Sequence, residues 1–189
     1  VMDLVETSGG NLEAMHREGM LQSVNAPIQA DIIPQGIPPH REYTATRLQV
    51  QANSYNTNLI KKADLPKTWA DLTRPIYKGE IQVANPASSG TAYTMIATLV
   101  QLMGEDAAFD YLKALHPNIS QYTRSGVAPI KAVARGEAAI SISFVHDGPG
   151  EKLNGFPVET LTPSDGTGAE IGSMSLIKGA RHLEAAKQF

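Results

Sequence analysis

Short apolar runs alternate with helix-forming segments along most of this 189-residue chain. The run 138–145 (AAISISFV) is typical of a buried strand, whereas 91–103 and 105–115 repeat apolar residues at helical spacing. Alternation of this kind builds a sheet with helices on its faces, so we expect an α/β fold. We expect further strands at 1–5, 43–55, 81–84, 156–161 and 170–177, and further helices at 12–18, 128–135 and the last nine residues. The helix at 91–103 is expected to bury Ile96, Leu99, Val100 and Met103.

Two glycine-punctuated stretches, 85–91 (NPASSGT) and 123–129 (TRSGVAP), each lead into an alanine-rich helix. Helix starts carry backbone N–H groups without internal partners and the positive end of the helix dipole, which favours a bound anion. The same side chains could serve only as helix N-caps, but one cap needs a single hydroxyl and several gather here. We predict an anion site made by Ser88, Ser89, Gly90, Thr91, Thr123 and Ser125.

A polar pair, His146 and Asp147, follows the strand 138–145. It is expected at the carboxyl end of that strand, where open α/β sheets place their ligands. The pair could bind hydroxyls, take part in acid–base chemistry, hold a metal or simply be structural. Glu170 follows a glycine-rich loop and precedes a strand, so it could be a ligand contact or a solvated carboxylate.

Composition excludes several classes of function. A net charge of −3 with scattered Lys and Arg argues against nucleic acid and anionic membranes as partners. The absence of cysteine removes disulfides, thiol nucleophiles and iron–sulfur clusters. We find no complete catalytic motif and expect no cofactor. Histidines 16, 40, 116 and 182 are far apart in the sequence, so no histidine metal cluster is expected.

Four motifs carry a resemblance to a known family: 66–72 (PKTWADL), 77–81 (YKGEI), 85–93 (NPASSGTAY) and 132–139 (AVARGEAA). With these motifs the chain resembles bacterial extracellular solute-binding proteins over nearly all of its length, and more narrowly the AfuA branch of the ferric-binding-protein family. The resemblance implies a monomeric periplasmic receptor that delivers its solute to an ABC permease in the inner membrane. Members of the family extend further at both ends, so we expect this chain to be a fragment.

The resemblance also implies a type II fold of two lobes joined by hinge strands. Residues 1–46 and 164–189 would form the first lobe, incomplete here, and residues 47–163 the second lobe with the hinge strands. The ligand would lie in the cleft, with Ser8 and Gly9 reaching it from the first lobe. Closure of the lobes would bury the ligand without covalent chemistry.

The ligand that the resemblance implies depends on the residues that follow the strand 138–145. Ferric-binding members hold iron there with neighbouring tyrosines, and this chain has none at that point. Because ferric ion favours anionic oxygen ligands such as phenolates, the resemblance favours a hexose phosphate or a related organophosphate instead. Hexose-phosphate-binding members of the family contact the sugar at positions that match His146, Asp147 and Glu170 in this chain. The alternatives are a ferric receptor of the same fold and a phosphohydrolase that uses His146 and Asp147.

Overall fold

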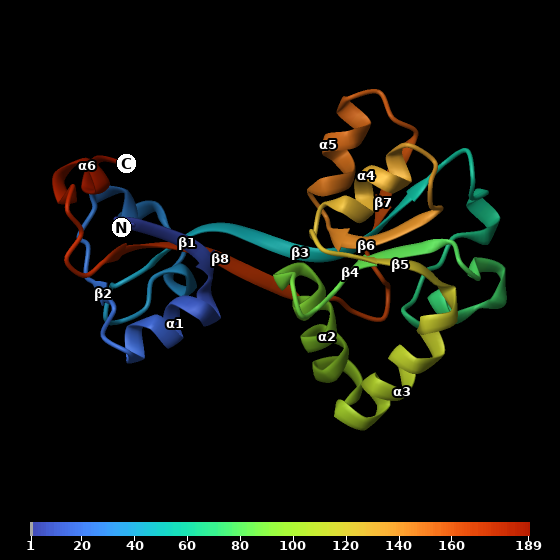
Figure 1. Ribbon diagram of the computed structural model, residues 1–189, viewed down its shortest axis with the longest axis horizontal. Coiled ribbons are helices and arrows are strands. Elements are labelled where there is room, and N and C mark those ends of the chain that lie inside the picture. The colour runs from blue at the N-terminus through green and yellow to red at the C-terminus, as the bar shows by residue number, and fades with distance from the viewer. Residues whose placement is uncertain (1) are drawn as a thin grey trace. The chain divides into compact units, whose positions relative to one another are not determined.

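The computed structural model describes residues 2–189, which divide into two compact units. The first unit contains the chain up to Gln49 and again from Glu170 to Phe189, and the second is the continuous stretch Val50–Ala169. Strands β3 (Thr44–Asn56) and β8 (Ala169–Ile177) are the segments in which the chain passes from one unit to the other (Figure 1). The boundaries expected from the sequence, 46/47 and 163/164, lie in β3 and shortly before β8. The assignment of segments to lobes stays a prediction.

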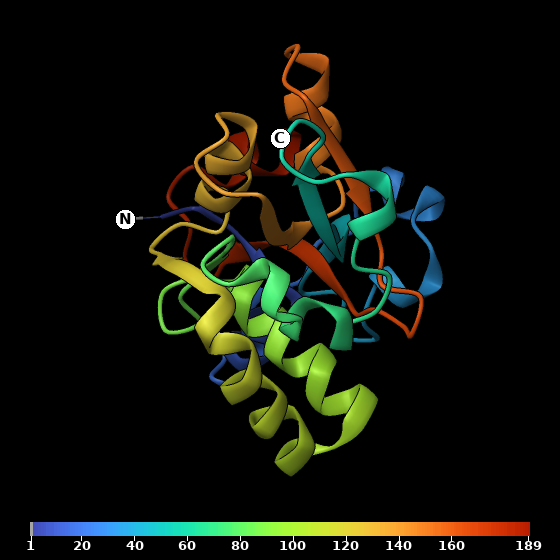
Figure 2. The same cartoon turned by 90° about the vertical axis from the view of Figure 1, so that its right-hand side faces the viewer.

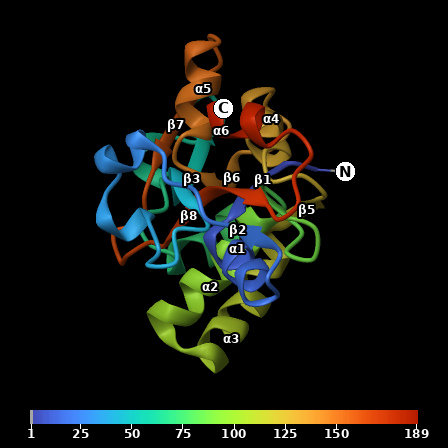
Figure 3. The same cartoon turned by 90° about the vertical axis from the view of Figure 1, so that its left-hand side faces the viewer.

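The first unit is a small sheet with one well-formed helix. Strand β1 (Leu4–Ser8) pairs antiparallel with β8, and the two-residue strand β2 (Leu21–Gln22) pairs with the end of β8. Helix α1 (Gly9–Arg17) follows β1 directly, as Figure 3 shows from the side of this unit. The remaining elements are two 3₁₀ turns, Pro27–Asp31 and Pro34–Gly36, and the short helix α6 (Leu183–Gln188).

The second unit is an α/β sandwich whose sheet has the strand order β7-β3-β6-β4-β5. Strands β4 (Ile81–Ala84), β5 (Ile119–Thr123) and β6 (Ile140–Phe144) run parallel, and β3 pairs antiparallel with β6 and with β7 (Val158–Leu161). Because the three parallel strands point the same way, their carboxyl ends share one edge of the sheet.

Helices cover both faces of this sheet (Figures 1 and 2). Helices α2 (Gly90–Met103) and α3 (Glu105–Leu115) lie on one face, over a core that includes Trp69. Helices α4 (Ala128–Ala134) and α5 (Asp147–Leu153) lie on the other, where α4, β7 and the residues before β6 form a smaller core. Single-turn 3₁₀ segments complete the unit, at Lys62–Asp64, Ala70–Thr73, Pro75–Tyr77 and His116–Asn118.

The α/β class and the strands at 81–84 and 170–177 are confirmed, but three local predictions need correction and one helix was missed. The strand expected at 1–5 is half-buried and runs from Leu4 to Ser8, while Val1 lies outside the described residues. Helix α1 begins at Gly9, three residues before the predicted start. Helix α5 was not predicted. In helix α2, Leu99 is buried as predicted and Ile96 and Val100 pack half-buried against the core, but Ala92, Met95 and Thr98 are buried as well and Met103 is exposed.

None of the helices described between residues 2 and 189 combines the length and apolar character needed to cross a bilayer.

Candidate functional site

The two glycine-punctuated stretches meet at the carboxyl edge of the second unit's sheet. They follow β4 and β5, which are neighbouring parallel strands. The backbone N–H of Asn85 donates to the carbonyl of Thr123 at 2.7 Å, and the hydroxyl of Ser88 donates to the carbonyl of Arg124 at 3.0 Å. These bonds join the stretches, so the residues of the predicted anion site in 85–91 and 123–125 form one local group.

The start of α2 has the properties that anion binding requires. Ser89 is the N-cap residue, yet its buried side chain makes no capping hydrogen bond. The first backbone N–H groups of a 14-residue helix have no acceptor inside the helix. The hydroxyls of Ser89 and Thr91 stand close to the backbone of Gly126: a methyl group added there would lie 3.0 Å from Ser89 Oγ and would overlap Thr91 Oγ1. Glycine at 126 therefore lets the second stretch approach the helix start.

The start of α4 is less suited to this task. Its N-cap is Val127, which supplies no side-chain cap, and the helix has seven residues. The hydroxyl of Thr123 donates to the carbonyl of Ser125 at 2.9 Å, which fixes the turn. Ser125 is exposed at the same place. Of the two helix starts in the sequence prediction, α2 is the stronger.

Asp147 is tied to the end of β6, the third strand at this edge. Its Oδ2 accepts the backbone N–H of Phe144 at 3.1 Å, and its Oδ1 lies 3.5 Å from Nε2 of the exposed His146. The Asp147 side chain is 8% exposed, and this burial raises the pKa of its carboxyl above the usual value. The Phe144 N–H and the charge of His146 pull the pKa the other way, but burial is the larger cause.

Ser8, Gly9 and Glu170, the other predicted site residues, belong to the first unit. Ser8 pairs with Gly172 across β1 and β8, so these three residues lie near one another. Ser8 caps α1 by accepting the N–H of Asn11 at 3.3 Å, which is a structural role. A methyl group on Gly9 would lie 3.2 Å from the carbonyl oxygen of Ile171.

Sequence reasoning missed two features. The first is Arg124, an exposed cation inside the stretch 123–129, whose guanidinium makes no ion pair with any residue between 2 and 189. Its position among the predicted hydroxyls was the available signal. The second is a histidine pair: His16 and His40, expected to be far apart, stack with ring centroids 3.7 Å apart.

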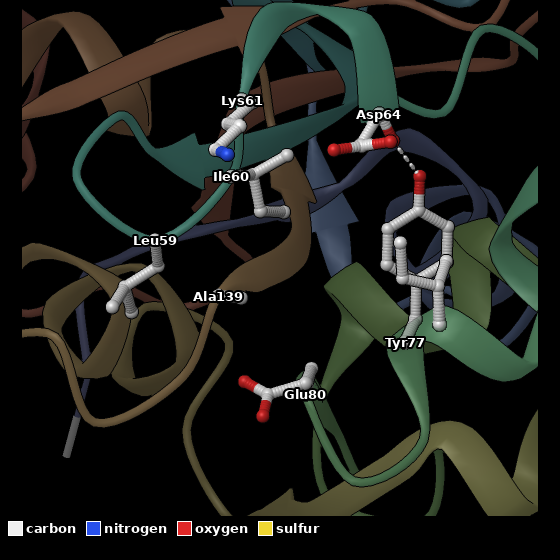
Figure 4. A pocket seen from close by; sticks show the side chains of 8 residues that line it. Leu59, Ile60, Lys61, Asp64, Tyr77, Glu80 and Ala139 are labelled. Atoms are coloured by element: carbon white, nitrogen blue, oxygen red, sulfur yellow. Dashed lines mark hydrogen bonds between the residues drawn. The ribbon is translucent and has the colours of Figure 1, made fainter.

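A pocket of about 310 Å³ lies elsewhere in the second unit (Figure 4). Glu80 and Ala139, which help to line it, immediately precede β4 and β6. In Figure 4 the Tyr77 hydroxyl reaches Asp64, to whose carbonyl oxygen it donates. The pocket thus opens near the amino ends of the parallel strands, whereas open α/β sheets bind ligands at the carboxyl ends. We do not assign it to the predicted site.

Comparisons with known proteins identify relatives of the chain. The family model of bacterial extracellular solute-binding proteins matches residues 3–189. The structure of the periplasmic binding protein AfuA from Actinobacillus pleuropneumoniae, with exogenous fructose-6-phosphate bound, has a TM-score of 0.91 and 42% identity, covering 100% of this chain and 61% of that one. An uncharacterized protein of Haemophilus influenzae is 56% identical over 137 residues, covering 71% of this chain and 40% of the relative.

A more distant relative is the Fe(3+)-binding periplasmic protein of Serratia marcescens, 26% identical over 173 residues, which covers 88% of this chain and 50% of the relative. The chain thus spans between 40% and 61% of the length of these three proteins.

Proposed function

This chain belongs to the bacterial extracellular solute-binding protein family, in the branch of AfuA and the ferric-binding proteins, and we propose that the whole protein is the solute-binding component of an ABC importer. The family and the type II fold agree with the sequence prediction, and so does the periplasmic location. The named relatives with a stated role are binding proteins. Our proposal is therefore reversible capture of a solute, handed to a membrane permease, with no covalent step.

The proposed ligand is a phosphorylated small solute, of which hexose phosphates are the leading class. The observation that carries this proposal is the start of α2, where free backbone N–H groups and the hydroxyls of Ser89 and Thr91 gather, next to the stretch that carries Arg124, whose carbonyl accepts the Ser88 hydroxyl. A phosphate oxygen accepts hydrogen bonds from all three kinds of donor, and a guanidinium can bind it in bidentate fashion. The AfuA structure named above carries fructose-6-phosphate.

The remaining site residues would recognise the rest of the solute. His146 and Asp147 follow β6, beside the strand that leads to α2, so they share the carboxyl edge with the phosphate donors. A buried carboxylate that accepts a hydroxyl hydrogen discriminates strongly against a solute without that hydroxyl. Contacts from Ser8, Gly9 and Glu170 are part of the same proposal.

Ferric ion is the second candidate because the Serratia marcescens relative is an Fe(3+)-binding protein. In this chain β6 is followed by Val145, His146 and Asp147, so no phenolate stands at that strand end. Hard ferric ion favours anionic oxygen ligands. We therefore favour the organophosphate over the metal, and we place a phosphohydrolase below both.

Thermal unfolding of the protein at its full natural length separates these candidates. A hexose 6-phosphate at one hundred times its Kd should stabilise the folded protein by about 2.7 kcal/mol, because the ligand binds only the folded state. The free hexose and ferric citrate should leave the unfolding temperature nearly unchanged. Stabilisation by ferric ion alone would refute the proposal, and release of inorganic phosphate over time would identify an enzyme.

Arg124→Gln tests the phosphate contact. Loss of a charge-assisted hydrogen bond should weaken binding by about 1.5–3 kcal/mol, roughly tenfold to more than a hundredfold. The matched control is Arg135→Gln in the same unit, whose guanidinium pairs with Glu137 on the surface. Equal affinities of the two variants would place the phosphate elsewhere.

A further inference from the structure

Two histidines and two carboxylates cluster in the first unit, between the last turns of α1 and the residues before β3. The rings of His16 and His40 stack with an interplanar angle of 9°. Nδ1 of His16 lies 2.7 Å from Oε2 of Glu42. His16, His40 and Glu42 each offer one ligand atom, and these three atoms all lie within 4.8 Å of one another. Imidazole nitrogen and carboxylate oxygen are the ligand types of zinc sites that keep an open position.

We propose that His16, His40 and Glu42 bind a divalent transition-metal ion of the zinc class. Zinc holds such ligands at about 2.0–2.2 Å, so two ligand atoms of one ion stand roughly 3–4 Å apart. The cluster therefore has to contract by only about 1 Å to surround an ion. None of these residues belongs to the proposed solute site, so each proposal can be refuted without affecting the other.

One hydrogen bond of His40 already selects the tautomer that metal binding through Nδ1 requires. Its Nδ1 accepts the backbone N–H of Glu42 at 3.1 Å, so in the neutral ring the proton is on Nε2. Nε2 in turn lies 3.5 Å from Oε2 of Glu13. A carboxylate behind the far ring nitrogen is the usual support of a metal-bound histidine, because it fixes the ring and raises its basicity. The ion would replace the Glu42 N–H at Nδ1.

The charge balance of the cluster also suits a cation. Glu42 and Glu13 bring two carboxylates to two imidazoles, and Glu13 is held in place by the Tyr43 hydroxyl at 3.1 Å and by Arg17 at 3.2 Å. The side chains of His16 and Glu42 are 30% and 23% exposed, so an ion can enter from solvent yet meets a partly dehydrated site. In the metal-free protein a proton lies between these two side chains, and a metal would displace it.

Metal binding must also disturb the ring stack. Lone pairs lie in the plane of an imidazole, so two parallel rings direct their lone pairs in parallel and not toward one point. At least one ring therefore has to turn when both coordinate the same ion. This rearrangement gives a readout that a surface-bound ion would not produce.

The full-length protein, purified without a histidine tag, is titrated with Zn²⁺ in a calorimeter to test the proposal. We expect one saturable site, a visible absorption band of low-symmetry Co²⁺ when Co²⁺ replaces Zn²⁺, and shifts of the His16 and His40 ring signals in NMR spectra. Glu42→Gln and His16→Ala should each lose the site. Glu13→Gln, which removes only the supporting carboxylate, should weaken binding about 10–100-fold.

The matched control is His182→Ala, because His182 belongs to the same unit and hydrogen-bonds Asp3 outside the cluster. It should bind Zn²⁺ like the wild type. If His16→Ala fails to fold, Glu42→Gln keeps the shape of the side chain and still decides the question. Unchanged affinity in Glu42→Gln and His16→Ala, or an equal loss in His182→Ala, would overturn the proposal.

Discussion

Asp147 makes the folded protein sensitive to pH because its carboxyl is buried. Burial raises its folded-state pKa above the value of about 3.9 in an unfolded chain. Its contribution to stability is therefore complete below that unfolded pKa and is lost as pH rises through the folded pKa. Two further titratable groups affect this carboxyl: the charge of His146 lowers its pKa and that of Glu151 raises it.

Asp147→Asn should remove this sensitivity. The amide stays neutral at every pH and keeps an oxygen for the Phe144 N–H, so the variant should exceed the wild type in unfolding free energy at neutral pH by about 1.4 kcal/mol for each pKa unit of the elevation. The gain should vanish below about pH 4. Urea unfolding across this pH range measures it, with the exposed Asp110→Asn as control. A variant less stable than the wild type at neutral pH would contradict the prediction.

At this scale, the sequence predicted contacts within one sheet edge but not contacts made by a loop. Ser88 and Thr123 could be placed together because each belongs to a glycine-punctuated stretch that leads into a helix. His16 and His40 could not, because a proline-rich loop lies between them. The bond from the Val24 N–H to the Arg41 carbonyl at 3.1 Å closes that loop and returns His40 to α1. The spacing of apolar residues does not predict where a loop folds back onto a helix.

Helix α5 is the element that was hardest to predict from the sequence. Gly148 and Gly150 lower helix propensity, and Pro149 between them usually ends a helix. The helix forms because Asp147 secures its start and because Gly148 lets it pack against β3 and β7. In α2 the burial of Thr98 was not predicted either. Thr98 can be buried because its hydroxyl donates to the carbonyl of Thr94 at 2.8 Å. A prediction based on the spacing of apolar residues leaves threonine out.

The two glycines of α5 should respond in opposite directions to replacement by alanine. A methyl group on Gly148 would overlap the Thr160 hydroxyl and lie 2.6 Å from Ser54 Oγ, so Gly148→Ala should lose about 1–3 kcal/mol of stability. Nothing lies within 4 Å of a methyl group on Gly150, so Gly150→Ala should gain about 0.5–1 kcal/mol. Urea unfolding followed by tryptophan fluorescence measures both. Equal losses would mean that α5 does not pack as described.

At the scale of the molecule, the two units differ in how the chain builds them. The first draws on two separate segments, and its sheet depends on β1 from one of them pairing with β8 from the other. The second is one continuous stretch, and both hydrophobic core clusters found among residues 2–189 lie wholly within it. A domain with its own core and no missing strand can fold by itself. The second unit meets that condition.

Residues 50–169, made alone, should therefore fold cooperatively. Trp69, the single tryptophan, is 1% exposed in the larger core, where its indole N–H donates to the carbonyl of Gly166 at 3.0 Å. Its fluorescence and the near-ultraviolet circular dichroism should change together in one urea transition, as two-state unfolding requires. Residues 2–49 made alone lack β8 and should show no such transition. If the isolated stretch 50–169 binds a hydrophobic dye and shows no cooperative transition, its core depends on the rest of the chain.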